Sequence, residues 1–314
     1  MAFALPFYKP DPIELPVIDT PLPAIQPFGL LVATGVLVGA HLMRRWGEKH
    51  DLDDEHVRGL VVWAVIVGFI GAHLFDVLAY QYDQLADDPL LLLKFWSGIS
   101  SYGGIIGGVV GFLIYARRRG LPVWKYGDGA MIAFVPGFTF GRLACTVVHD
   151  HVGARSDGFF LAIDYPPGEI SGVSGLHHNL GFYEFLYMLV LCGILYGLHR
   201  WKSRPVGMMV AVMATAYAPV RFFLEFLRVN PQADPRYAGL TFAQWMSIVT
   251  VAIGLYLMVH LSRRGHSAAE AAVSPDRSDS GTSGDKGKSK GAEAASRGSV
   301  KSGKGKSGKR RKKK

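Results

Sequence analysis

Three charged side chains recur at helical spacing near the end of an otherwise apolar stretch. Residues 219–228 read PVRFFLEFLR and follow VGMMVAVMATAYA, a run without any charge. Spacings of four and three residues place Arg221, Glu225 and Arg228 on one face of a helix. Guanidinium groups fork onto phosphate oxygens and stay protonated, so this stripe predicts a site for an anionic group. A structural ion network near a membrane surface is the alternative interpretation, above all for Arg228.

Two further ionisable residues and a run of glycines lie inside apolar stretches. Arg142 is flanked by glycine in GFTFGRLACTVVHDHVG, residues 137–153, and Glu184 lies within FYEFL. An ionisable residue inside a membrane span costs a few kcal/mol, so it usually faces a cavity or a partner. We therefore expect Arg142 to bind a ligand. The glycines of residues 100–111 are more typical of close helix packing than of ligand contact.

Histidines stand beside an acidic residue or beside each other at three places. They are His149, Asp150 and His151 after the fourth apolar segment, His177 and His178 before the fifth, and His73 with Asp76 inside the second. Polar residues at a membrane interface are the plain interpretation of the first group. A zinc site there is disfavoured, because adjacent residues rarely chelate one ion well. We expect neither a metal nor a cofactor.

The elements that must position these residues are membrane helices. Hydrophobic residues make up 49% of the 314-residue chain, and the mean hydropathy of +0.21 is high for a soluble protein. A helix needs about 20 apolar residues to cross the hydrocarbon core. Seven segments qualify, at about 28–43, 59–79, 99–116, 128–148, 181–198, 206–227 and 240–262. The prediction is an all-α, polytopic membrane domain over residues 25–264.

Basic residues set the expected orientation. They occupy every second connection and the stretch after the last span: Arg44, Arg45, Lys49 and Arg58; Arg117, Arg118, Arg119 and Lys125; Arg200, Lys202 and Arg204; Arg263 and Arg264. The positive-inside rule then places the N-terminus in the periplasm and the C-terminus in the cytoplasm. The long connection 149–180 would face outward. The last span holds no lysine that could form a Schiff base, which excludes a retinal protein.

The two ends of the chain differ from the body. Residues 1–24 form an N-terminal segment expected in the periplasm, without the basic start of a signal peptide. Residues 265–314 hold 14 basic and 5 acidic residues among Gly, Ser and Ala. This composition predicts a disordered cytoplasmic tail that meets anionic lipids rather than nucleic acid. Cys145 and Cys192 each lie in an apolar stretch and are expected to be free thiols.

Six short motifs, met in order over about residues 25–262, resemble the bacterial prolipoprotein diacylglyceryl transferase family. They are FWSGISSYGGIIGG, GRLACTVVHDHVG, HNLGFYE, RPVG, RFFLEFLR and GLTFAQWMSI. The resemblance implies an enzyme that moves the diacylglyceryl group of phosphatidylglycerol onto the lipobox cysteine thiol of a prolipoprotein. This reaction is the first step of lipoprotein maturation and yields a thioether and glycerol 1-phosphate.

The resemblance also implies roles for residues at the motif positions. Arg142 and Arg221 would stabilise the charge that develops on the leaving phosphate, and Glu225 would hold Arg221 in place. The substrate-binding residues would be Arg142, Gly103, Gly104, Gly153, His178, Tyr183, Glu184 and Arg228. The incoming thiol would need a base to become a thiolate.

The chain departs from the family pattern where that base is concerned. Tyr102 stands where the family has a histidine before Gly-Gly, and Phe28, His73 and Val148 replace other motif residues, while Asp150 keeps the acidic position. A tyrosine hydroxyl is a poor base at neutral pH, whereas histidine suits the task, so His149 is predicted to take over. Two alternatives stay open. One is a homologue that binds phospholipid with altered or lost activity. The other is a transporter-like protein, although its two halves show no internal repeat.

Overall fold

The structure is a computed structural model that describes residues 4–13, 24–95, 98–229 and 236–273. The chain separates into two compact units, residues 1–271 and 272–314, and nearly all of the second lies outside the described residues. The predicted basic tail can therefore be followed only at its start. Helix α8 continues through Val273, so residues 265–273, which the sequence assigned to that tail, extend the last helix.

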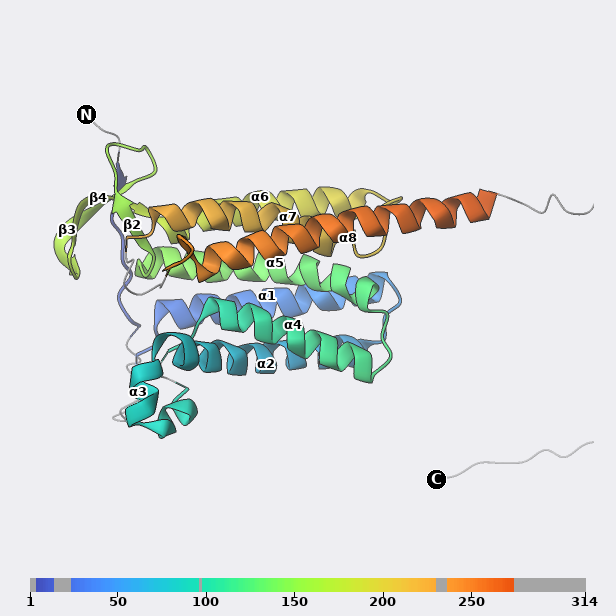
Figure 1. The fold of residues 1–314 in the computed structure, drawn as a ribbon, viewed down its shortest axis with the longest axis horizontal. Coiled ribbons are helices and arrows are strands. Elements are labelled where there is room, and N and C mark those ends of the chain that lie inside the picture. Colours follow the sequence, from blue (N-terminus) through green and yellow to red (C-terminus); the bar gives the residue numbers. More distant parts are fainter. Residues whose placement is uncertain (1–3, 14–23, 96–97, 230–235, 274–314) are drawn as a thin grey trace, which may run out of the picture. The chain divides into compact units, whose positions relative to one another are not determined.

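Long helices that run side by side make up most of the first unit (Figure 1). The helices are α1 (Pro27–Lys49), α2 (Asp54–Tyr80), α3 (Tyr82–Asp87), η1 (Pro89–Leu93), α4 (Ser101–Arg118), α5 (Val123–Val148), α6 (Leu180–Arg200), α7 (Met208–Leu224), η2 (Glu225–Leu227) and α8 (Phe242–Val273). The strands are β1 (Leu5–Pro6), β2 (Val152–Arg155), β3 (Ile163–Ile170), β4 (Val173–Asn179), β5 (Arg236–Tyr237) and β6 (Leu240–Thr241).

Six of the described helices are long and apolar enough to cross a membrane: α1, α2, α5, α6, α7 with η2, and α8 up to Arg263. The predicted all-α polytopic fold is thereby confirmed, whereas its orientation in the membrane stays a prediction. The expected third span forms α4, which is not among the six because its glycines and its two terminal arginines lower its hydropathy. Exposed Leu37, Ile66, Val190, Phe223 and Ile253 give the helices lipid-compatible sides.

Glycine lets α4 pack directly on the backbone of α2. A Cβ atom added to Gly107 would lie 3.1 Å from the Cα atom of Gly71, and one on Gly111 would lie 2.8 Å from the carbonyl of Trp63. A side chain at Gly103 would also clash with α2, and Gly104 faces the same helix. These contacts match the packing interpretation of the glycine run, and they fix the position of α4, which carries Tyr102.

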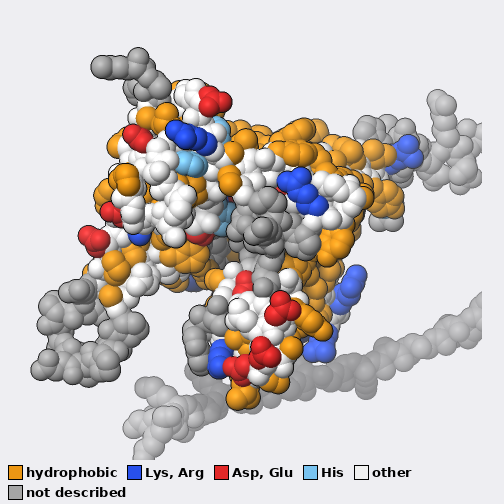
Figure 2. All heavy atoms as spheres, turned by 60° about the vertical axis from the view of Figure 1, so that its left-hand side comes forward, with side chains coloured by type: hydrophobic (Ala, Val, Ile, Leu, Met, Phe, Trp, Pro, Cys, Tyr) orange, Lys and Arg blue, Asp and Glu red, His pale blue; other side chains and the backbone are white. Residues whose placement is uncertain are grey.

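A four-stranded sheet in the order β1-β3-β4-β2 sits at one end of the helices, and the sequence did not reveal it (Figure 1). Strands β3 and β4 are antiparallel, with Tyr165 opposite Gly175, and β1 runs parallel to β3. His149 ends α5 in the left-handed conformation, with φ of 55°, and turns the chain toward β2. Figure 2 shows charged and histidine side chains at this end of the unit, in contrast to the apolar flanks of the helices.

The opposite end of α5 carries a buried aspartate that fastens α7. Asp128 accepts hydrogen bonds from the backbone N–H groups of Gly207 and Met209, both at 3.0 Å, and from Arg204 Nη1 at 3.2 Å. Its side chain therefore supplies the acceptor that the first turn of α7 lacks. The RPVG motif thus forms the turn that starts α7, with Gly207 in the left-handed region.

Candidate functional site

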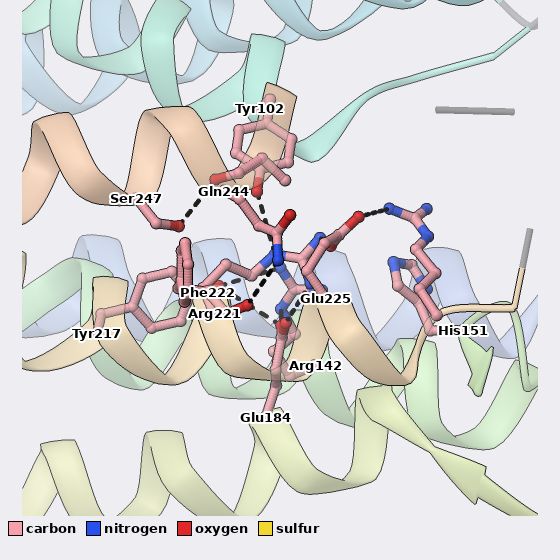
Figure 3. A network of polar contacts seen from close by, with 12 residues as sticks. Tyr102, Arg142, His151, Glu184, Tyr217, Arg221, Phe222, Glu225, Gln244 and Ser247 are labelled. Atoms are coloured by element: carbon pink, nitrogen blue, oxygen red, sulfur yellow. Dashed lines mark hydrogen bonds and ion pairs between the residues drawn. The ribbon is translucent and has the colours of Figure 1, made fainter. Parts of the chain in front are cut away.

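Five charged side chains from α5, α6, α7, η2 and the residue after η2 form one continuous series of ion pairs (Figure 3). Arg142 Nε lies 2.5 Å from Glu184 Oε2, and the other oxygen of Glu184 lies 3.2 Å from Arg221 Nη1. Arg221 Nη2 lies 2.9 Å from Glu225 Oε2, and Arg228 Nη1 lies 3.4 Å from Glu225 Oε1. We call these five residues the arginine–glutamate network.

The arginine–glutamate network is deeply buried at one end and open at the other. The exposed fraction of the side chain is 1% for Glu184 and Glu225, 5% for Arg142 and 7% for Arg221, but 34% for Arg228. Three arginines against two glutamates leave one excess positive charge among the five. The four buried charges balance two against two, and the third arginine, Arg228, lies at the open end, where an anionic group can approach.

The charged stripe on α7 owes its shape to local sequence. Arg221 and Glu225 pair at a spacing of four residues, and Glu225 and Arg228 at a spacing of three, as the sequence predicted. Pro219 lies inside α7, and the helix tightens into the 3-10 turn η2 at Glu225. Glu184 joins this stripe to Arg142 from a separate helix, and that link depends on tertiary packing.

Two tyrosines and a phenylalanine complete the surroundings of the arginines. The hydroxyl of Tyr102 accepts a hydrogen bond from Arg221 Nε at 3.1 Å. The hydroxyl of Tyr217 accepts one from Arg142 Nη2 at 3.3 Å and donates to Glu184 Oε2 at 3.5 Å. The guanidinium carbon of Arg142 lies 4.6 Å from the centre of the Phe138 ring, a cation–π contact.

Sequence reasoning missed Tyr217 and Phe138, although a local signal was present. Each lies four residues before an arginine of the network on the same helix, Tyr217 before Arg221 and Phe138 before Arg142. Residues at that spacing share a helix face. Searching one turn on either side of each predicted arginine would have found both aromatic side chains.

Helix α8 is fixed against the network by its first residues, which belong to the GLTFAQWMSI motif. The backbone N–H of Thr241 donates to Gln244 Oε1 at 3.0 Å, and that of Gln244 donates to Thr241 Oγ1 at 3.3 Å. This reciprocal pattern is a capping box. The amide nitrogen of Gln244 also donates to the carbonyl of Phe222 at 3.5 Å, next to Arg221 (Figure 3).

His149, predicted as the base, lies in the sheet region instead of the network. Its Nε2 donates to the carbonyl of Tyr8 at 3.0 Å, and its Nδ1 accepts from the side-chain amide of Asn179, also at 3.0 Å. The ring stacks on Phe7, with 4.5 Å between ring centroids. Burial lowers the pKa of His149, which favours the neutral ring. These contacts tie the N-terminal segment to the end of α5.

His151 and Asp150 form a close pair beside the network. His151 Nδ1 lies 2.5 Å from Asp150 Oδ1, and their side chains are 20% and 37% exposed. Figure 3 shows His151 near Glu225, on the side away from Tyr217. The structure thus places Asp150 and His151, but not His149, beside the arginines of the network.

The described residues offer one group of potential metal ligands, formed by Cys145, Asp150 and His151. Their ligand atoms all lie within 4.8 Å of one another. Two ligand atoms about 2.1 Å from one zinc ion in tetrahedral geometry would be about 3.4 Å apart. The 2.5 Å between His151 and Asp150 is shorter and fits a hydrogen bond, so the geometry of this pair does not suit a shared metal ion.

The remaining predicted substrate-binding residues lie in or beside the sheet, and Gly153 contacts the exposed end of the network at Arg228. His178 Nδ1 and the hydroxyl of Tyr183 are 2.8 Å apart. Burial and the neighbouring His177 lower the pKa of His178. Gly153 forms a β-bridge with Arg228, and a Cβ atom there would lie 2.9 Å from the carbonyl of Leu227. Glycine at this position lets β2 approach the backbone beside Arg228.

The residues that depart from the family pattern fill structural places. His73 is fully buried, with Nδ1 at 3.2 Å from the carbonyl of Gly98 and Nε2 at 3.2 Å from that of Leu91. Asp76 accepts a hydrogen bond from Gln81 at 2.6 Å. Both contacts fix the segment that leads from α2 to α4. Cys145 and Cys192 are free thiols, as predicted.

Comparison with known proteins gives one consistent result. The family model described as prolipoprotein diacylglyceryl transferase matches residues 17–260. A phosphatidylglycerol–prolipoprotein diacylglyceryl transferase of Synechococcus elongatus is 31% identical over 265 residues, which cover 82% of this chain and 89% of the relative. A protein of the same name from Allorhizobium ampelinum is 30% identical over 276 residues, covering 84% of this chain and 94% of the relative. The motif resemblance is confirmed.

Proposed function

The chain belongs to the prolipoprotein diacylglyceryl transferase family, and from this premise we propose that it transfers the diacylglyceryl group of phosphatidylglycerol to a prolipoprotein cysteine. The acceptor is the thiol of the lipobox cysteine, and the reaction is the first step of lipoprotein maturation. The setting is a bacterial inner membrane, which agrees with the six apolar helices. No cofactor is required for this exchange of a C–O bond for a C–S bond.

The observation that carries the proposal is the pair of buried guanidiniums, Arg142 and Arg221, that Glu184 holds next to each other in the arginine–glutamate network. Phosphatidylglycerol presents a phosphodiester with one negative charge, whose oxygens guanidinium groups bind through paired hydrogen bonds. When sulfur attacks the glyceryl carbon, the C–O electrons leave with glycerol 1-phosphate, whose phosphate gains negative charge. Preorganised guanidiniums in a poorly hydrated site stabilise this developing charge more strongly than water does.

Each residue of the network has a definable task in this reaction. Arg142 and Arg221, both buried, hold the phosphate oxygens in the transition state. Glu184 touches both guanidiniums and sets the distance between them. Glu225 positions Arg221 and Arg228, and the more exposed Arg228 receives the incoming headgroup. Gly103, Gly104 and Gly153 act through packing, because each faces neighbouring protein atoms.

Tyr102 takes part in binding the donor. Its hydroxyl already accepts a hydrogen bond from Arg221, so its own proton can be donated to another acceptor. A phosphate oxygen held by Arg221 would lie within reach of that proton. Tyr102 thereby keeps a polar function at the position where the family has a histidine.

The surroundings supply further partners. The basic residues 286–314 lie outside the described residues, and we propose that they bind anionic lipids on the cytoplasmic side. The N-terminal segment would then lie in the periplasm, where prolipoproteins expose their lipobox. We expect no nucleic-acid partner.

Transfer to a synthetic peptide tests the proposal. Purified protein in vesicles that contain labelled phosphatidylglycerol should convert a lipobox peptide into a thioether-linked diacylglyceryl peptide, detectable by mass spectrometry. A peptide with serine in place of cysteine should stay unmodified. A protein that retains phosphatidylglycerol through detergent washing yet modifies no peptide would be the binding-only homologue. That result would overturn the proposed transferase function.

A further inference from the structure

The incoming thiol must lose its proton, and the arginine–glutamate network is poorly suited to accept it. Each of its carboxylates is already shared by two arginines: Glu184 by Arg142 and Arg221, and Glu225 by Arg221 and Arg228. Protonating either carboxylate would break the ion pairs that hold the guanidiniums in place. The base has to come from beside the network.

We propose that His151, oriented by Asp150, is the base that takes the proton from the lipobox thiol. This assignment rests on the proposed transferase function and names a residue outside the motif positions that the chain shares with its family. It also differs from the assignment of His149 that the sequence suggested.

The pair geometry is the first support for His151. Asp150 Oδ1 lies 2.5 Å from Nδ1, so Nδ1 carries a proton toward the carboxylate and Nε2 is the basic nitrogen. The carboxylate also stabilises the imidazolium that forms when Nε2 accepts a proton. With 20% of its side chain exposed, His151 is reachable by a substrate entering at this end.

The location is the second support. Figure 3 shows His151 at the end of the network near Glu225, and Glu184 lies close enough to interact with it electrostatically. The thiol of Cys145 on α5 lies within 4.8 Å of the ligand atoms of this pair. Arg228 reaches the same place through the bridge of its backbone to Gly153. The charged residues around the His151 ring are thus Asp150 and Glu184, both negative, and Arg228, which is positive.

The other candidate groups are occupied. Both ring nitrogens of His149 are used, one by the carbonyl of Tyr8 and one by the amide of Asn179. His177 Nδ1 lies 3.1 Å from the carbonyl of Gly175 in the sheet. His178 bonds to Tyr183. Among the histidines described at this end, His151 combines an acidic partner with a place beside the network.

The thiol proton moves to Nε2 of His151, and the sulfur electron pair forms the C–S bond with the glyceryl carbon. The C–O bond breaks, and its electrons stay on the phosphate of glycerol 1-phosphate. The imidazolium then returns its proton to that phosphate or to water, which regenerates the neutral ring for the next cycle.

The test compares the pH dependence of transfer in wild type, His151→Asn and the control His177→Gln. Asparagine keeps a hydrogen bond to Asp150 but has no basic nitrogen. We expect His151→Asn to lower single-turnover transfer on the order of 100-fold at pH 7. The deficit should shrink toward pH 9, because a free thiol ionises unaided near a pKa of about 8.5. His177→Gln should follow the wild-type profile.

Further measurements separate the possible failures. Retention of phosphatidylglycerol and thermal unfolding in detergent should be unchanged in His151→Asn, and His151→Gln serves if asparagine does not fold. Asp150 acts through His151, so Asp150→Asn should lower kcat while KM changes little. It should also shift the pH dependence of transfer. A wild-type profile for His151→Asn, or a deficit independent of pH, would overturn the assignment of His151. Absence of transfer in the wild-type protein would instead overturn the proposed function.

Discussion

Helix α5 carries a buried charge near each end, and the two are treated differently. Near its start, Asp128 is matched by Arg204 and by the backbone N–H groups of Gly207 and Met209. About 21 Å further along the helix, at 1.5 Å per residue, Arg142 enters a network with one more arginine than glutamates. The first cluster pairs one aspartate with one arginine, whereas the second joins three arginines through two glutamates and is partly exposed at Arg228.

This difference separates structural from functional burial of charge. A matched buried pair contributes to the choice of one conformation and stabilises little beyond what an apolar replacement would. Two buried guanidiniums held side by side by one carboxylate, in a network that is partly exposed at one end, suit an anionic ligand. Substitutions at either end of α5 test whether the Arg142 end serves transfer and the Asp128 end serves folding.

Glu184→Gln should have the largest effect. The amide keeps the shape of the side chain but leaves Arg142 and Arg221 without the charge that lies between them. Two buried guanidiniums would then repel each other, and we expect transfer to fall at least 100-fold, about 2.7 kcal/mol of transition-state stabilisation. Thermal unfolding in detergent should show a lower Tm, and rates should be normalised to the folded fraction. Transfer near the wild-type rate would show that Glu184 does not position the arginines.

Arg221→Lys comes next and separates charge from geometry. Lysine keeps the positive charge but lacks the planar fork that contacts Tyr102, Glu184 and Glu225 together. We expect transfer to fall at least about tenfold, or about 1.4 kcal/mol, with little change in Tm. Arg228→Lys is the matched control and should be tolerated, because that side chain is 34% exposed. The reverse result would place the phosphate nearer the surface, at Arg228.

Tyr102→Phe should have a smaller effect. It removes one hydrogen bond to Arg221 and the hydroxyl proposed to reach the phosphate, while the ring and its packing on Phe242 remain. One neutral hydrogen bond contributes about 1 kcal/mol, so we expect a loss of about fivefold in kcat/KM. Steady-state transfer at several phosphatidylglycerol densities measures it. A loss as large as that of Glu184→Gln would assign Tyr102 a direct part in the chemistry.

The features of this site that could be predicted from the sequence are those formed within a single helix. Apolar runs and a spacing of four residues sufficed to predict the helices and the pairing of Arg221 with Glu225, because both follow from helix geometry. The contact of Glu184 with Arg142 and Arg221 joins three helices, and no local pattern encodes it. Sequence reasoning named all three residues but could not state how they pair.

The four-stranded sheet escaped prediction for a physical reason. Strand β2 has four residues and β1 only two, and β1 comes from residues 5–6, far from its partner β3 in the sequence. Such short strands carry no usable alternation of apolar and polar residues, and the longer β3 is interrupted by Pro166 and Pro167. The choice between His149 and His151 depended on this sheet. Beyond the left-handed turn at His149, the His149 ring lies in the sheet region and the His151 ring lies near Glu225.

Asp128→Asn should have the smallest effect on transfer and is the counterpart of Glu184→Gln. The amide leaves Arg204 without its counter-charge and has one acceptor oxygen for the backbone groups of Gly207 and Met209. Breaking a buried pair in this way costs about 3 kcal/mol, so Tm should fall clearly. Transfer per folded molecule should nevertheless stay within about twofold of wild type, because distant sites with no shared partners are nearly independent. Unfolding in detergent gives the folded fraction, and peptide transfer below Tm gives the rate. If Asp128→Asn lowered the rate per folded molecule as much as Arg221→Lys, the two ends of α5 would be coupled, and the pair of guanidiniums at Arg142 and Arg221 would not by itself mark the functional end.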